Sequence, residues 1–374
     1  MIPLSRPEFG DEEARAVADV LKTGWVSQGP KVAEFESLLA ARVGAAYGVA
    51  TTSCTTALHL ALVASGIGAG DEVICPSYSF VATANAVLYA GATPVFADIQ
   101  PDTWNIDPAD VATRVTSKTR AILAVHQVGL AADLDAIRGA APARVPIIED
   151  AACAIGSLYK GRPVGSSGNV ACFSFHPRKT ISLGEGGMVT TNDVAVADRV
   201  RMLRSHGASV SDLDRHQAKG LVFEEYRELG YNYRMTDIQA AIGVEQLKRL
   251  DDLLTRRRAV AGRYNTAFCK VAQIQTPAEP AYAQHAYQSY AIRLRPGGRI
   301  TRDGMMRGLI DAGVTCRRGI PPIHLEPLYL SRGRVSLPIT EAVASESIFL
   351  PMYASLPEAD QAQVIDAVIR IATR

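Results

Sequence analysis

The hydrophobic and polar positions of this chain follow two patterns in turn. Apolar residues recur at helical spacing over Asp11–Thr23 and Pro30–Arg42. From Ala50 to about Val189, helical segments alternate with short, continuous apolar runs of the kind that buried strands show. Alternating helices and strands predict a mostly parallel sheet with helices on both faces, so we expect an α/β fold.

The region after this alternation predicts more helices and one polar loop. Thr190–Ser205 has helical spacing, and the polar stretch Ala208–Glu228 is expected to be a mobile loop near the functional site or a subunit interface. Thr236–Phe268 predicts one long helix, or two, that bridges to a smaller unit; its apolar stripe consists of Leu247, Leu250, Leu253 and Leu254.

The last third of the chain predicts that smaller unit. It has a strand pattern over Tyr287–Leu294 and helical patterns over Arg302–Ala312 and Glu358–Thr373. We therefore expect two domains, a large one over residues 1–250 that includes the N-terminal helices and a small C-terminal α/β domain over residues 251–374.

Composition and charge narrow the classes of function. The 374 residues suffice for one large and one small domain, and a formal net charge of +1 gives no field that would attract nucleic acid or an acidic membrane. The chain starts with an acidic helix rather than an apolar signal region, and no stretch is long and apolar enough to span a bilayer. None of the six cysteines forms a Cys-x-x-Cys pair, so we expect reduced thiols, no metal site and a cytoplasmic protein.

The candidate chemistry begins with Lys179. It follows the apolar run Val170–Phe175, whose end is marked by Pro177, and Gly186 and Gly187 lead into the next apolar run. A lysine at the mouth of a buried element is expected to lose proton affinity and to become a nucleophile that forms a Schiff base, most commonly with pyridoxal phosphate. The alternative is a solvated surface lysine.

A second segment, Val145–Asp150, is an apolar run that ends in two carboxylates. Ligands of open α/β sheets bind outside such strand ends, and a pyridoxal enzyme needs a carboxylate there to pair with the ring nitrogen. Asp150 is the candidate for this role, with a helix N-cap as the alternative. Glu149 points to the other side of the strand and is expected to be structural.

Two further segments add contacts for a cofactor. Hydroxylated residues around Thr55 and Thr56 begin an apolar helix, which predicts an anion site or a simple cap, and Ser174 adds a hydroxyl from the strand before Lys179. Phe80 follows the strand Glu72–Pro76 and is a candidate to stack on the ring, with a core aromatic as the alternative.

Together these segments resemble the DegT/DnrJ/EryC1/StrS family of sugar-nucleotide aminotransferases. The resemblance covers nearly the whole chain, from Gly24–Pro30 through Gly70–Ile74, Gly91–Phe96 and Gly230–Met235 to Pro322–Leu325. It implies an aspartate-aminotransferase-like fold (fold type I of pyridoxal-phosphate enzymes), with a large domain around a mostly parallel sheet and a smaller α/β domain.

The resemblance also assigns roles. Lys179 matches the Schiff-base lysine, Asp150 the partner of the ring nitrogen, and Phe80 the stacking aromatic. Other matching positions are the phosphate contacts Thr55, Thr56 and Ser174, the asparagine that a neighbouring subunit donates to the phosphate (Asn232), and the residues Glu185 and His324 near the sugar. The implied assembly is a homodimer with shared active sites.

Two positions depart from the family pattern. Cys153 stands where the family has Gln or His three residues after the aspartate, and Cys54 stands where a Gly precedes the phosphate threonine. The residue at the first position flanks the ring oxygen of the cofactor in relatives, so its hydrogen bond is expected to be missing here or taken by water. Because Lys179 is kept, transamination is favoured over the dehydration that relatives with a histidine there perform.

The implied reaction moves an amino group from glutamate to a nucleoside-diphosphate keto-sugar by a ping-pong course through pyridoxal and pyridoxamine phosphate. The His176–Pro177 approach and the Glu185 return resemble relatives that aminate C4 of a 4-keto-6-deoxy sugar, including the perosamine-synthase type, in polysaccharide or O-antigen biosynthesis. Arg317 and Arg318 are candidates to bind the diphosphate, with an exposed strand edge as the alternative. The other hypotheses are a C3 aminotransferase on the same scaffold and a catalytically silent sensor or scaffold protein.

Overall fold

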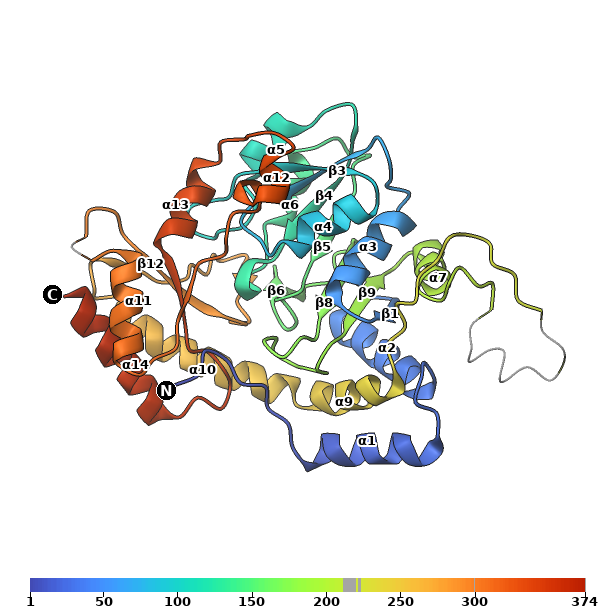
Figure 1. Ribbon diagram of the computed structural model, residues 1–374, viewed down its shortest axis with the longest axis horizontal. Helices are drawn as coiled ribbons and strands as arrows, with labels where there is room; N and C mark the ends of the chain where they lie inside the picture. Colours follow the sequence, from blue (N-terminus) through green and yellow to red (C-terminus); the bar gives the residue numbers. More distant parts are fainter. Residues whose placement is uncertain (211–219, 221–222, 299, 374) are drawn as a thin grey trace.

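The computed structural model describes residues 1–210, 220, 223–298 and 300–373 of the chain. It contains a large and a smaller main sheet, with helices packed on both (Figure 1). The predicted loop Ala208–Glu228 lies partly outside the described residues. No helix in the part of the chain that the structure describes is long and apolar enough to cross a membrane.

The large sheet has seven strands in the order β1-β9-β8-β5-β4-β2-β3. Neighbours from β8 to β3 are parallel, whereas β9 runs antiparallel to both β1 and β8, so the prediction of a mostly parallel sheet is confirmed. In sheet order the strands span Tyr47–Thr51, Gly187–Thr191, Val170–Ser174, Ile147–Asp150, Thr119–Val125, Glu72–Pro76 and Thr93–Ala97.

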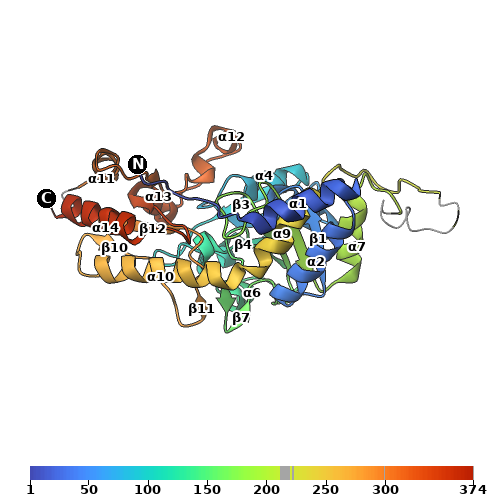
Figure 2. The same ribbon diagram turned by 90° about the horizontal axis from the view of Figure 1, so that it is seen from below.

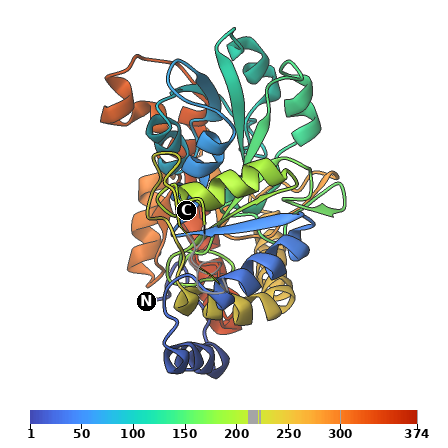
Figure 3. The same ribbon diagram turned by 90° about the vertical axis from the view of Figure 1, so that its right-hand side faces the viewer.

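Helices cover both faces of this sheet, and a separate apolar core lies under each face. One core takes side chains from α2 and α9, and the other from α3, α4 and α7. Figure 3 shows α1 outermost, then the layer of α2 and α9, then the sheet, then α7. These helices are α1 (Asp11–Thr23), α2 (Pro30–Val43), α3 (Cys54–Ala64), α4 (Ala82–Tyr89), α5 (Pro108–Arg114), α6 (Leu134–Gly139), α7 (Val194–Leu203) and α9 (Asp237–Lys248), with a 3-10 turn η1 (Gln127–Gly129).

The helix predicted over Thr190–Ser205 starts later than expected. Thr190 and Thr191 belong to β9, where they pair with β1, and β-branched residues suit such a position. The helix begins after Asp193, whose carboxylate accepts hydrogen bonds from the amides of Ala195 and Val196.

The smaller main sheet has four strands in the order β10-β12-β14-β13, all antiparallel to their neighbours. Its strands span Ile274–Gln275, Tyr290–Leu294, Ser347–Leu350 and Arg317–Arg318. Helices α11 (Arg302–Asp311) and α14 (Glu358–Ala372) contribute to its core, and α12 (Pro327–Leu330), α13 (Pro338–Glu346) and the 3-10 turn η2 (Ile323–Leu325) connect its strands. A third, minor sheet joins β11 (Ala283–Gln284), β6 (Leu158–Tyr159) and β7 (Arg162–Pro163).

The long helical stretch after residue 236 forms two helices, α9 and α10 (Leu250–Phe268). The first turns of α10 place Leu250, Leu253 and Leu254 in the core of the large sheet, and its later turns place Tyr264 and Phe268 in the core of the smaller sheet. Helix α10 therefore runs between the two cores (Figure 2). The proposed domain division at residue 250 falls at the junction of α9 and α10.

Candidate active site

Lys179 lies in the loop between β8 and β9, at the carboxyl end of a parallel strand. Its backbone N–H donates to the carbonyl of His176, and its Nζ donates to the Sγ of Cys153 at 3.1 Å. Cys153 follows β5, the neighbouring strand, so two adjacent strand ends supply this contact. The residue is half-buried rather than a solvated surface lysine.

The expectation that Lys179 loses proton affinity is wrong for the cofactor-free chain. Burial does lower the pKa of its amine, but the charge and hydrogen bond of Cys153 and the charges of Cys54 and Asp150 raise it by more. The net pKa of Lys179 is raised. Its neighbours come from α3 and β5, which sequence spacing around the lysine did not reveal.

Asp150 ends β5 with its side chain almost completely buried. Its Oδ2 accepts from the Oγ1 of Thr83 at 2.8 Å, and its Oδ1 accepts from the amide of Ala152 at 3.2 Å. Burial raises the pKa of this carboxyl, although both hydrogen bonds and the charge of Lys179 oppose the rise. A desolvated carboxyl of this kind gains stability from any cation placed beside it.

Glu149 points to the opposite side of β5, as strand alternation predicted. Its Oε2 accepts from the ring Nε2–H of His126 at 3.0 Å. Its Oε1 accepts from the hydroxyl of Ser167 and from the side-chain amide of Asn169. These bonds outweigh the effect of burial and lower the pKa of Glu149, so the carboxylate is satisfied within a structural network.

The start of α3 combines a cap with open donors. Ser53 is the N-cap: its Oγ accepts from the amide of Thr56 at 3.2 Å, and the hydroxyl of Thr56 donates to the carbonyl of Ser53. Thr55 makes no side-chain hydrogen bond with any described residue. Because first-turn amides have no partner inside a helix, this end offers N–H groups and one free hydroxyl to an anion.

The anion-binding start of α3 lies beside one row of paired residues in the three strands nearest to it, β1, β9 and β8. Gly187 pairs with Thr51 of β1 on one side and with Ser174 of β8 on the other. A Cβ at Gly187 would lie 2.3 Å from the carbonyl of Ser53 and 2.6 Å from the amide of Cys54, so only glycine permits this approach. The row therefore brings the mostly buried hydroxyl of Ser174 to the same edge as the start of α3.

Two predicted cofactor contacts are exposed in the single chain. Phe80, between β2 and α4, is 69% exposed, which excludes the alternative of a core aromatic. It lies one turn before Thr83, whose hydroxyl binds Asp150. Asn232 is exposed next to Tyr233, whose carbonyl accepts from the amide of Thr52 just before α3.

The predicted substrate residues are spread over both main sheets. Glu185 is exposed in the loop that returns to β9. Arg317 and Arg318 are exposed on β13, the edge strand of the smaller sheet. Burial lowers the pKa of Arg317, and the positive charges of Arg178 and Arg318 lower it further, so Arg317 lies within electrostatic range of the lysine loop.

His324 is buried, and both of its ring nitrogens have partners. Nδ1 lies 2.6 Å from the Oγ of Ser77, and Nε2 lies 3.3 Å from a carboxylate oxygen of Glu341. The residue ties the loop after β2 to α13. A contact with substrate would require one of these bonds to exchange, so its role in binding stays a prediction.

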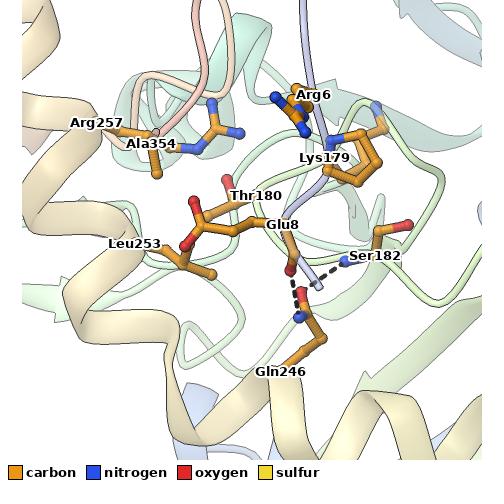
Figure 4. Close-up of a pocket in the computed structure, with 10 residues that line it drawn as sticks. Arg6, Glu8, Lys179, Thr180, Ser182, Gln246, Leu253, Arg257 and Ala354 are labelled. Carbon is orange, nitrogen blue, oxygen red and sulfur yellow. Dashed lines mark hydrogen bonds between the residues drawn. The ribbon is translucent and has the colours of Figure 1, made fainter. Parts of the chain in front are cut away.

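Nothing in the sequence indicated the residues that pack against the Lys179 loop on the side of the N-terminal segment and α10. A small cavity of about 10 Å³, large enough for one water molecule, lies there between the N-terminal segment and α10 (Figure 4). Thr180 Oγ1 and Arg257 Nε are buried without a partner among the described residues, and both residues line the cavity. Burial lowers the pKa of Arg257 to about 10. The sequence did not reveal that Arg257 is buried, because it lies in an Arg-Arg-Arg run that resembles a solvated helix face.

The arrangement fits a phosphorylated pyridine aldehyde. An amine and a desolvated carboxyl lie at neighbouring strand ends, where the charge of each shifts the pKa of the other. The start of α3 and the hydroxyls of Thr55 and Ser174 supply donors for a phosphate. Lys179, Asp150, Thr55 and Ser174 would therefore hold pyridoxal phosphate by its aldehyde, ring nitrogen and phosphate.

Comparison with known proteins gives a family match over most of the chain. A model of the DegT/DnrJ/EryC1/StrS aminotransferase family matches residues 7–369. The spore coat polysaccharide biosynthesis protein SpsC of Bacillus subtilis (strain 168) is 41% identical over 373 residues, which cover 98% of this chain and 96% of SpsC. The GDP-perosamine synthase of Caulobacter vibrioides is 39% identical over 373 residues, which cover 99% of this chain and 98% of that protein.

A solved structure matches the whole fold. The protein named putative sugar aminotransferase Spr1654, from Streptococcus pneumoniae, superposes in its PMP form with a TM-score of 0.94 at 28% identity, covering 100% of this chain and 99% of Spr1654. The same protein in its PLP form gives a TM-score of 0.92. The similarity therefore extends to structures that carry both forms of the cofactor.

Proposed function

Because this chain belongs to the DegT/DnrJ/EryC1/StrS aminotransferase family, we propose that it transfers an amino group from glutamate to C4 of a nucleoside-diphosphate 4-keto-6-deoxy sugar. The chain is a pyridoxal-phosphate-dependent sugar-nucleotide aminotransferase. The position on the sugar, the amino donor and the residues that act are parts of this proposal. The observation that carries the proposed site is the placement of Lys179 and Asp150 at the ends of adjacent parallel strands.

Lys179 is proposed as the residue that holds the cofactor and then moves protons. When bound, pyridoxal phosphate supplies an aldehyde that combines with amines and a ring that accepts electrons. The Nζ of Lys179, once released by the donor amine, takes the proton from the α-carbon of glutamate. In the second half of the reaction, Nζ returns a proton at C4 of the sugar.

Asp150 is proposed to keep the ring nitrogen protonated. Its carboxylate is fixed by the hydroxyl of Thr83 and the amide of Ala152, so its orientation does not depend on the ligand. Burial has raised the pKa of Asp150, and a pyridinium beside it would offset the desolvation of the carboxylate. The electron-accepting form of the ring is thereby stabilised.

The choice of C4 rests on similarity. The segments around His176–Pro177 and Glu185 resemble relatives that act at C4, and a protein named GDP-perosamine synthase is 39% identical over nearly the whole chain. Arg317 lies within electrostatic range of Arg178, beside Lys179, which favours binding of the substrate diphosphate near the loop.

We also propose a homodimer. Residues 223–230, which precede Asn232, project from the body of the chain in Figure 1, and three of their apolar side chains are strongly exposed: Phe223 by 84%, Tyr226 by 65% and Leu229 by 85%. Apolar side chains on a projecting segment favour burial against a second subunit. Asn232 would then reach the phosphate of the neighbouring site.

The test combines colour, labelling and substrate choice. Purified protein loaded with cofactor should be yellow, and glutamate should bleach the visible band. Borohydride followed by peptide mapping should label Lys179 in the wild type and in Lys248→Ala, a control that changes an exposed lysine paired with Glu245. Label elsewhere would contradict the role of Lys179.

A substrate panel then decides the position on the sugar. Pyridoxamine-loaded protein should recover its visible band with 4-keto nucleotide sugars and not with 3-keto isomers. Recovery with the 3-keto isomers alone would move the reaction to C3. Protein that stays colourless after reconstitution would favour a silent scaffold.

A further inference from the structure

Cys153 and Lys179 form a thiol–amine contact at the bottom of the site. The Sγ and Nζ atoms are 3.1 Å apart, and both residues are half-buried rather than sealed in the core. They come from the loops after β5 and β8, which are neighbouring parallel strands, so the sheet holds them together.

The other cysteines have different surroundings. Cys75 and Cys172 are buried in strands of the large sheet. The thiols of Cys54, Cys269 and Cys316 donate to backbone carbonyls. Cys153 is thus set apart by an amine as its hydrogen-bond partner.

We propose that Cys153 and Lys179 are joined by a reversible sulfur–nitrogen bond when a hydroperoxide oxidises the cofactor-free site. In the first step the sulfur of Cys153 attacks the peroxide, so that an S–O bond forms, the O–O bond breaks and water or an alcohol leaves. In the second step Nζ of Lys179 attacks that sulfur, so that an S–N bond forms, the S–O bond breaks and water leaves. The sulfur is oxidised, the peroxide is reduced, and the pair loses two hydrogens.

The electrostatics of the pair change in favour of the second step. In the reduced site the charge of Cys153 contributes to the raised pKa of Lys179, whereas burial acts to lower it. Oxidation turns the sulfur into a neutral sulfenic acid, which removes the contribution of Cys153, while the lowering by burial and the raising by Cys54 and Asp150 remain. The amine therefore loses its proton more readily at the moment when an electrophilic sulfur lies beside it.

The consequence is a site that cannot take up its cofactor until it is reduced. A lysine bonded to sulfur has no free amine for an aldehyde, and a thiol such as dithiothreitol restores it by attack on the sulfur. The bond itself follows from the contact between the two side chains. Protection by pyridoxal phosphate rests in addition on the proposed role of Lys179.

The experiment uses the full chain, with and without cofactor, exposed to hydrogen peroxide. Intact-mass analysis of the cofactor-free protein should show a decrease of about 2 Da, the two hydrogens lost, and dithiothreitol should reverse it. Peptide mapping should find the Cys153 peptide joined to the Lys179 peptide. With pyridoxal phosphate at about ten times its dissociation constant, the linked peptide should fall about tenfold, because occupied sites are protected.

Two variants separate this reaction from general oxidation. Cys153→Ser should abolish the linked peptide, whereas Cys269→Ser, which changes the exposed cysteine, should leave it unchanged. Oxygen added to Cys153 without a link, or a link that persists in Cys153→Ser, would overturn the proposal. A link that forms equally with and without cofactor would support the bond but contradict the role of Lys179 in the proposed function.

Discussion

The hydroxyl of Thr83 offers the sharpest test of how Asp150 is held. It donates to Oδ2 of Asp150 at 2.8 Å, lies 2.8 Å from the hydroxyl of Ser79, and is almost fully buried. Thr83→Val replaces the hydroxyl by a methyl of similar shape. The carboxylate of Asp150 then keeps the amide of Ala152, at 3.2 Å, as its nearest donor.

The size of the effect follows from the charge of the acceptor. A hydrogen bond to a charged group contributes about 1.5–3 kcal/mol, so the free energy of unfolding of the cofactor-free protein should fall by about that amount at neutral pH. The pKa of Asp150, which burial already raises, should rise further by about one to two units at 1.36 kcal/mol per unit.

The pH dependence has a definite sign. A carboxyl whose pKa is raised in the folded state contributes stability below its unfolded pKa, and that contribution is lost as pH rises through the folded pKa. Thr83→Val enlarges the rise, so the stability gap to wild type should be widest at neutral pH. As pH falls through the raised pKa of Asp150 toward its ordinary value of about 4, the gap should close, because the carboxyl becomes neutral in both folded proteins.

Urea unfolding of both proteins at pH 7 and in mild acid measures this gap. Thr83→Ser is the matched control, because it keeps the hydroxyl and removes only a methyl group, at a cost of about 1 kcal/mol. Equal losses for the Val and Ser variants, or a gap for Val that does not change with pH, would refute the assignment of this hydrogen bond to a charged carboxylate.

Three further predictions concern the frame of the site. Gly187→Ala should lower the free energy of unfolding by about 1–3 kcal/mol or more, because its Cβ meets backbone 2.3 Å away, whereas Gly262→Ala, in open space on α10, should be neutral or stabilising in the same urea assay. Glu149→Gln should lower the free energy of unfolding by about 3–5 kcal/mol at neutral pH. Because the pKa of Glu149 is lowered, this loss should shrink below about pH 4, and a loss that does not change with pH would contradict the role of the charged carboxylate. Leu229→Asp should shift sedimentation from dimer to monomer and Leu21→Asp, on exposed α1, should not; a dimeric Leu229→Asp protein would exclude that surface.

The sequence revealed those parts of the fold that depend on local patterns. The helix over Asp11–Thr23 has the predicted bounds because three acidic residues in its first turn and Gly24 at its end mark both limits. The strand that ends at Asp150 was predicted from its apolar run, and alternation along it correctly separated the directions of Asp150 and Glu149.

Features that depend on contacts between distant segments were not predictable in this way. The two-residue strand Arg317–Arg318 carries too little pattern to be recognised, although it closes the smaller sheet. Thr83, in an Ala-rich segment, has no local sign of its bond to Asp150. The raised pKa of Lys179 arises from Cys153 and Cys54, whose proximity only the folded sheet creates.

The insertion of β9 between β1 and β8 has a consequence for how the protein matures. Among the described residues, β1 pairs in the large sheet with β9 alone, so Thr51 and Ser174 share one row through β9, a segment more than a hundred residues downstream of β1. Closing so long a loop is entropically costly and slow compared with local pairing. Because the proposed phosphate contacts at this row need β9 paired on both sides, we expect cofactor capture to follow the assembly of this part of the sheet.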